Sequence, residues 1–296
     1  MHKCRPGMMN RSVAFLATLL WLLCCAAGAR AQTPATTIPD LKTALAGLAD
    51  RVKHYYDRIS TIICVETVTQ QELRFNRAPI GKPRVTVYEL SVTRDPRAKT
   101  GAEFRVERTL QSVNGRPARK YQEPECTDPK TGTPEPLAFL LAKNQGSFKF
   151  WFPSGAADGP GGATAIDFRQ TPPERVDIKW KGNCFSADGG GEEGRIWFDP
   201  DTFDVLQIDQ RLPKPFPVPV PWLFGSPSVA IRVEESEVTM RFTRVKFEKP
   251  DETVLLPEST EIVTVFRGAT SLRTVQVLSN FRRFLAESTV RPVRMY

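Results

Sequence analysis

Apolar positions near the start of the chain recur with a helical period. Side chains at steps of three and four residues share one face of an α-helix. The apolar run consists of Leu41, Leu45, Leu48, Val52 and Tyr55 or Tyr56. Asp40 stands directly before this run, where a short acceptor side chain caps a helix. We therefore expect an amphipathic helix that ends near Ser60.

Beyond this helix the apolar period changes to two, which is typical of strands. Polar turn sequences such as Asn114-Gly115 and Pro200-Asp201-Thr202 separate the strands. The expected strands are 62–75, 85–94, 104–113, 175–184, 194–199, 205–211, 229–234, 238–248, 261–267 and 272–284, with a bulge near Thr243 and a short helix over 136–144. Strands joined by tight turns form an antiparallel sheet, and a long sheet of this kind curls. We predict an α+β fold, a large curved antiparallel sheet with the N-terminal helix packed on its concave face.

The first 31 residues have the layout of a cleavable secretory signal peptide. Basic residues precede an apolar stretch over 13–27, and Ala29-Arg30-Ala31 is a small-x-small cleavage site. The apolar stretch is shorter than the roughly 20 residues that span a bilayer. A membrane anchor, or lipid attachment at Cys24 or Cys25, is the alternative. We expect a signal peptide over 1–31 and a single domain over 32–296, periplasmic or secreted, with no transmembrane span in the mature chain.

Loss of the leader changes the charge of the chain. The leader holds four of the 41 lysine and arginine residues and none of the 33 acidic ones, so the net charge falls from +8 to +4. Nucleic-acid binding needs a concentrated basic stripe, which a charge of +4 does not indicate. Nucleic acid is therefore not an expected partner.

Three cysteines follow the leader, and the oxidising compartment makes one disulfide plausible. We favour a pair between Cys126 and Cys184, because both lie in loop-like surroundings rich in glycine and proline. Cys64 follows Ile62-Ile63 and fits a buried apolar position. Three free thiols are the alternative.

Residues with catalytic chemistry are scarce. His54 is the one histidine after the leader, and Asp57 follows it within a helical turn. A general base in an exported hydrolase is one interpretation, and an ordinary interface position near the helix end is the one we favour. The chain has no G-x-S-x-G nucleophile elbow, no paired-cysteine clamp and no phosphate-binding loop. We expect no enzymatic activity, no metal and no cofactor.

Residues 213–227 form a Pro-rich arm. Proline at every second position from Pro213 to Pro221 removes the N–H donors that a central strand needs. The arm carries four large apolar side chains, which are Phe216, Trp222, Leu223 and Phe224. We interpret them as a lip that meets a ligand, a partner or a membrane surface. A rigid crossover that packs them on the core is the alternative.

The run GRIWFDPDTFDVLQID over 194–209 resembles the strand-turn-strand of periplasmic lipoprotein-carrier (LolA-like) and sigma-regulator (RseB-like) domains. The turn Leu256-Pro257-Glu258-Ser259 is similar to the start of a strand that often follows in those domains. The resemblance is specific over 194–268 and elsewhere extends to the order of elements. It implies a half-barrel whose concave side holds helices and leaves an apolar cavity for acyl chains. The ligand-gating residues of the carriers have no matched positions here, so lipoprotein transport is not implied.

These observations favour an exported, non-catalytic binding protein of the bacterial envelope, which binds an apolar ligand (a lipid or acyl chain) or a partner protein. Two alternatives stay open. One is a secreted hydrolase that uses His54 with a carboxylate, and the other is an envelope scaffold that acts through the Pro-rich arm.

Overall fold

The computed structural model describes the chain from Pro39 to Arg283 with several gaps. The described ranges are 39–94, 104–119, 126–154, 159, 162–173, 175–181, 184–188, 191–219 and 231–283. They belong to one compact unit, Ile38–Tyr296. The expected signal peptide over 1–31 lies outside the described residues. Within them, no helix combines the length and the apolar character that a membrane crossing requires.

The expected helix is confirmed as α2, Leu41–Arg58. Asp40 caps it, because its carboxylate accepts hydrogen bonds from the Thr43 backbone N–H at 3.1 Å and from the Thr43 hydroxyl at 2.6 Å. The apolar face is buried through Ala44, Leu48 and Val52 among others. The helix therefore forms where the local sequence pattern places it.

Among the described residues, twelve strands form one sheet, and every pairing in it is antiparallel. The strands are β1 (Ile62–Leu73), β2 (Pro79–Arg94), β3 (Phe104–Val113), β4 (Arg116–Pro117), β5 (Phe148–Trp151), β6 (Thr164–Gln170), β9 (Glu193–Phe198), β10 (Val205–Arg211), β11 (Phe216–Val218), β12 (Ile231–Glu248), β13 (Asp251–Arg267) and β14 (Ser271–Arg283). Their order is β4-β3-β2-β1-β14-β13-β12-β10-β9-β6-β5, with β11 also paired to β12. The sheet is open, with β4 and β5 at its two ends.

A separate hairpin, β7 (Asp177–Lys181) and β8 (Cys184–Asp188), replaces the one strand expected over 175–184. Strand β7 lies within the expected range, but the expected strand extended too far, because Cys184 already belongs to β8 and pairs with Lys181. The two strands expected over 229–234 and 238–248 are the single strand β12, which keeps its course through register shifts at Val233/Glu235 and Arg241/Phe242. The second shift is the bulge expected near Thr243.

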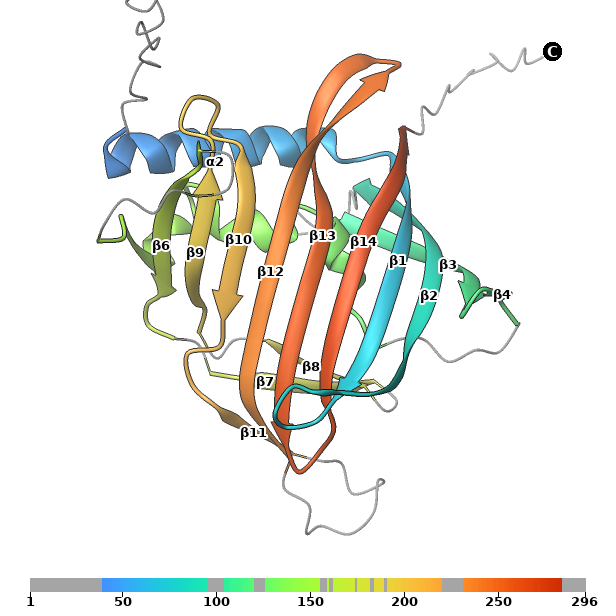
Figure 1. Ribbon diagram of the computed structural model, residues 1–296. Coiled ribbons are helices and arrows are strands. Elements are labelled where there is room, and N and C mark those ends of the chain that lie inside the picture. The colour runs from blue at the N-terminus through green and yellow to red at the C-terminus, as the bar shows by residue number, and fades with distance from the viewer. Residues whose placement is uncertain are drawn as a thin grey trace, which may run out of the picture. The chain divides into compact units, whose positions relative to one another are not determined.

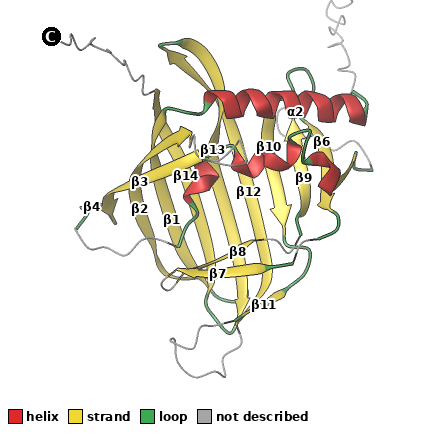
Figure 2. Cartoon of the chain, turned by 180° about the vertical axis from the view of Figure 1, so that it is seen from behind, coloured by secondary structure: helices red, strands yellow, loops and turns green. Residues whose placement is uncertain are grey.

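The helices that the structure describes lie on one face of the sheet (Figure 1, Figure 2). Helix α2 crosses the strands near one end, and the β7–β8 hairpin crosses them near the other (Figure 1). Seen from behind, both lie in front of the sheet (Figure 2). The same layer holds three 3₁₀ helices, η2 (Pro129–Gly132), η3 (Glu135–Leu140) and η4 (Gln145–Ser147), where the sequence predicted a short helix over 136–144. The predicted fold, a curved half-barrel with its N-terminal helix on the concave face, is confirmed.

Candidate functional site

The concave face is apolar beneath helix α2. Leu48 and Val52 of the helix and Leu137 and Leu140 of η3 belong to one buried cluster with sheet side chains such as Leu90. Aromatic rings extend this cluster toward the β5 edge, where the centroids of Phe139 and Phe168 lie 4.6 Å apart. Burial of such side chains contributes about 1.5–3 kcal/mol each to folding. This half of the face is where an apolar ligand would find matching surroundings.

Two hydroxyl groups interrupt the apolar layer. Tyr55 and Tyr56 of α2 are buried, with exposed fractions of 4 % and 6 %. Neither hydroxyl has a hydrogen-bond partner among the described residues. Burial raises the pKa of Tyr55 well above its ordinary value, and the neighbouring Tyr56 and Cys64 add to the effect. Burial also raises the pKa of the free thiol of Cys64 to about 12. An unpartnered buried hydroxyl costs about 1–3 kcal/mol, so a group that pairs with one gains affinity.

A polar cluster also lies on the concave face. Glu66 of β1 is 1 % exposed, and its Oε1 accepts hydrogen bonds from Arg108 Nη2 at 2.5 Å and from Gln276 Nε2 at 3.1 Å. The guanidinium of Arg108 also lies over the ring of Tyr88, 5.0 Å from its centroid. β1, β3 and β14 thus bring together three polar side chains that are far apart in the sequence.

Burial dominates the electrostatics of this cluster. It raises the pKa of Glu66, and the charge and hydrogen bond of Arg108, with the amide of Gln276, oppose the shift. The second carboxylate oxygen, Oε2, and Arg108 Nε are buried without a hydrogen-bond partner among the described residues. Buried polar atoms in proteins are nearly always paired, so this place suits a water molecule or a polar ligand atom.

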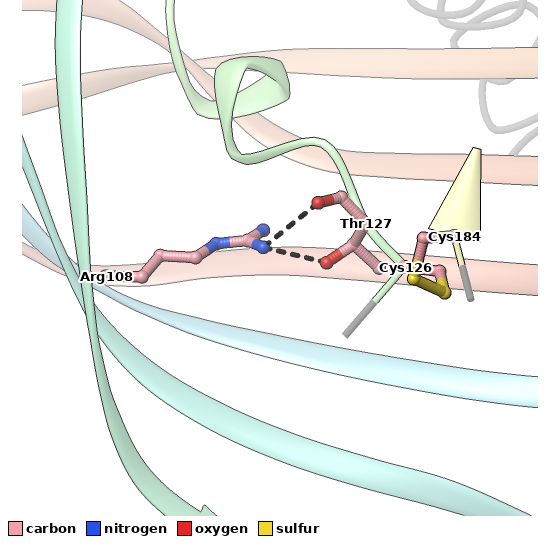
Figure 3. The surroundings of a disulfide bond; sticks show 4 residues. All are labelled: Arg108, Cys126, Thr127 and Cys184. Atoms are coloured by element: carbon pink, nitrogen blue, oxygen red, sulfur yellow. Dashed lines mark hydrogen bonds between the residues drawn. A yellow bond between two sulfur atoms is a disulfide. The ribbon is translucent and has the colours of Figure 1, made fainter. Parts of the chain in front are cut away.

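A short segment covers the polar cluster, and we call residues 126–133 the strap. Arg108 Nη1 donates to the carbonyl oxygen of Thr127 at 3.3 Å and to its hydroxyl at 2.7 Å (Figure 3). Thr131 donates its hydroxyl to Gln276 Oε1 at 2.8 Å. A disulfide joins Cys126 at the start of the strap to Cys184 of β8. This is the pairing that the sequence favoured, and it fastens the strap to the β7–β8 hairpin.

The Pro-rich arm begins as the short strand β11 and runs along β12. Val218 is buried, Phe216 is half-buried and Pro217 is exposed. Among the described strands β11 pairs with β12 alone, and edge strands are where proline is tolerated in a sheet. Trp180 of β7 donates its Nε1–H to the carbonyl oxygen of Pro219 at 2.9 Å. The start of the arm is therefore packed and bonded, whereas Trp222, Leu223 and Phe224 lie outside the described residues.

The geometry around His54 offers no catalytic pair. The side chain is exposed on α2, and Nδ1 lies 2.8 Å from the carbonyl oxygen of Asp50 in the preceding turn. The carboxylate of Asp57 lies beside Lys53, 3.9 Å from its Nζ. Over the described ranges, no group of three histidine, cysteine or acidic side chains is placed to hold a metal ion.

The sequence reasoning missed Glu66, Arg108 and Gln276. A signal for Glu66 exists, because Ile62, Cys64, Glu66 and Val68 alternate in one phase and the other three are apolar. A carboxylate in the buried phase of a strand needs a partner. Arg108 and Gln276 carry no comparable signal, since their meeting depends on the pairing of strands distant in the chain.

No protein-family model and no curated protein matches the chain. Among solved structures, it is similar to a DUF1329 family protein from Desulfovibrio piger, with 11 % identity and a TM-score of 0.42, covering 84 % of this chain and 95 % of that one. It is also similar to a LolA superfamily protein from Nitrosomonas europaea, with 6 % identity and a TM-score of 0.35, covering 81 % and 94 %.

Proposed function

We propose that this protein is an exported, non-catalytic binding protein that holds an apolar ligand, an acyl chain above all, against the concave face of its sheet. The observation that carries the proposal is the pair of buried hydroxyls of Tyr55 and Tyr56, which lie within an apolar layer and have no hydrogen-bond partner in the described part of the chain. An acyl chain matches the layer, and the oxygen of its carboxyl or ester group matches the hydroxyls. The signal peptide expected over 1–31 would place this binding in the periplasm or outside the cell.

The way in which the helix is attached supports the same proposal. Leu48 and Val52 meet the sheet through apolar contact. The polar contacts that join α2 to other described elements include the ion pair of Arg51 with Asp204 and the hydrogen bond from Gln145 Nε2 to the Leu45 carbonyl oxygen at 3.0 Å. An acyl chain can replace apolar contacts without leaving a buried polar group unpaired. In this proposal Phe216, Trp222, Leu223 and Phe224 of the arm form a lip at the ligand.

The test combines extraction with titration. Organic extracts of the natively purified protein are analysed by mass spectrometry, and the delipidated protein is titrated with the fluorescent fatty acid cis-parinaric acid. We expect an acyl lipid in the extract and saturable binding of the probe. No acyl lipid and no saturable binding would overturn the proposal. An empty protein that co-purifies with another chain would instead favour an envelope scaffold acting through the Pro-rich arm.

The double variant Tyr55→Phe/Tyr56→Phe tests the role of the hydroxyls. We expect it to bind the probe several-fold to about tenfold more weakly, the worth of one or two hydrogen bonds. Its stability in urea should match or exceed that of the wild type, because no partner is lost. Phe75→Ala is the matched control, since Phe75 is 63 % exposed and lies outside the apolar cluster. Equal probe affinity of the double variant and the wild type would show that the two hydroxyls do not contact the ligand.

A further inference from the structure

A pocket lies on the face of the sheet opposite to the proposed acyl site. It has a volume of about 480 Å³ and is lined by residues of β5, β6, β9, β10 and β12. Along β9, Ile196 and Phe198 point into the core, and Arg195 and Trp197 line the pocket. Successive side chains of a strand point to opposite faces, so this outer pocket is separated from the concave face by the sheet itself.

The floor of the outer pocket is held rigidly. Trp197 Nε1 donates to Asp209 Oδ2 at 3.0 Å, and the guanidinium of Arg195 lies over the indole, 5.4 Å from the ring centroid. Asp209 also accepts from the hydroxyl of Thr239 at 2.9 Å. A Cβ at Gly194 would lie 2.0 Å from the carbonyl oxygen of Asp209, so only glycine allows the strands to approach this closely. A floor fixed in advance reduces the ordering cost of binding.

Most charged groups of the pocket are paired with one another, whereas Glu237 pairs with Arg77 outside the lining. Asp167 accepts two hydrogen bonds from Arg195, at 2.6 and 3.0 Å. Arg169 Nε and Arg211 Nε each donate to Glu193, at 2.8 Å. The walls therefore present donors and acceptors side by side. The pair of Arg195 and Asp167 is balanced, and the triad of Glu193 with two arginines carries one positive charge. Over the whole lining, three arginines stand beside four acidic side chains, so neither sign dominates.

An aromatic ring stands at the rim of the pocket. Trp151 ends the edge strand β5, and it is 40 % exposed although it is one of the largest apolar side chains of the chain. Phe148 and Phe150 of the same strand pack toward the core, which directs Trp151 to the pocket face. A large exposed aromatic beside a polar pocket is typical of a ligand contact.

We propose that the outer pocket binds a neutral saccharide. A pyranose ring has an apolar face that stacks on an indole and hydroxyl groups that both donate and accept, which suits Trp151 beside the pairs Arg195–Asp167 and Arg169–Glu193. A charged ligand would meet like charges as closely as opposite ones. An apolar ligand would strip water from ion pairs without replacing its hydrogen bonds. The saccharide class is therefore the one that matches both halves of the pocket.

The experiment uses two neutral oligosaccharides, chitotetraose and maltotetraose, added to the full mature chain. Binding is followed by calorimetry and by the indole N–H signals in ¹⁵N NMR spectra, with Trp197 assigned through Trp197→Phe. We expect saturable binding of at least one of the two and a shift of the Trp197 signal. Trp151→Ala should weaken binding about tenfold, the worth of one stacked aromatic contact. Phe75→Ala, at an exposed ring outside the pocket, should leave it unchanged.

Two results would overturn the inference. One is the absence of binding of either oligosaccharide at millimolar concentration, and the other is binding that Trp151→Ala leaves unaffected. Because the two sites lie on opposite faces, Trp151→Ala should not change the affinity for cis-parinaric acid. The failure of one proposal therefore leaves the other standing.

Discussion

Gly47 lies within helix α2, where the ring of Phe203 leaves no room for a larger side chain. Glycine normally weakens a helix interior by about 1 kcal/mol relative to alanine. Here a Cβ would lie 2.5 Å from Cγ of Phe203, whose backbone has a φ of 57° in the β9–β10 turn. We expect Gly47→Ala to lower the free energy of unfolding by about 1–3 kcal/mol, as overpacking does, measured in urea. In a Phe203→Ala background the same change should stabilise, and stabilisation in the wild type would contradict the contact.

Glu66 should give stability a characteristic dependence on pH. Burial raises its pKa above 4.5 in the folded protein, so folding favours the protonated carboxyl. Its contribution to stability is therefore complete below the ordinary pKa and is lost as the pH rises through the raised one. Glu66→Gln cannot titrate, so the variant should gain stability relative to the wild type between acidic and neutral pH. Urea midpoints across this range measure the difference, and parallel profiles for the two proteins would contradict it.

At the scale of elements, buried Asp204 joins α2 to the sheet. Its carboxylate pairs with Arg51 of α2 and, at 2.5 Å, with Arg244 of β12. Either arginine alone leaves Asp204 one partner, whereas Arg51→Ala/Arg244→Ala leaves a buried charge with neither of these partners. We expect the double variant to lose about 3–5 kcal/mol of unfolding free energy, more than the two single losses together. A double-mutant cycle in urea measures the excess, and strict additivity would contradict the shared role of Asp204.

Local signals explain which elements could be predicted from the sequence. Helix α2 and the hairpin of β9 and β10 were predicted almost to their ends, because a cap, a period and a turn sequence lie within each segment. Strand β6 was missed, since the Gly-rich stretch before it reads as loop and its pairing partner β9 is distant in the chain. The candidate sites depend on the same non-local pairing. Asp204 in particular reads as a turn residue until the fold brings two arginines to it.

At the scale of the whole molecule, the concave face is covered by segments that are fastened at two separated places. Asp204 holds one end of the cover through α2, and the disulfide between Cys126 and Cys184 holds the strap and the β7–β8 hairpin. Between these joints α2 and η3 meet the sheet through apolar contact, and the strap meets it through hydrogen bonds with Arg108 and Gln276. In the function proposed above, the ligand would replace side-chain contacts in the middle of this layer while the two joints hold its ends.

The disulfide is the covalent one of the two joints. It closes a chain segment with a sequence separation of 58 residues, for which the loss of unfolded-state entropy corresponds to about 4 kcal/mol. We expect Cys126→Ser/Cys184→Ser to lose about 2–4 kcal/mol in urea unfolding, and a reductant to produce the same loss in the wild type. Cys64→Ala is the control. This variant should lose as much stability to the reductant as the wild type does, since Cys64 is buried and takes no part in the disulfide. A reductant effect in the double serine variant as large as in the wild type would show that the crosslink is not its cause, because no disulfide between these positions would be left to break.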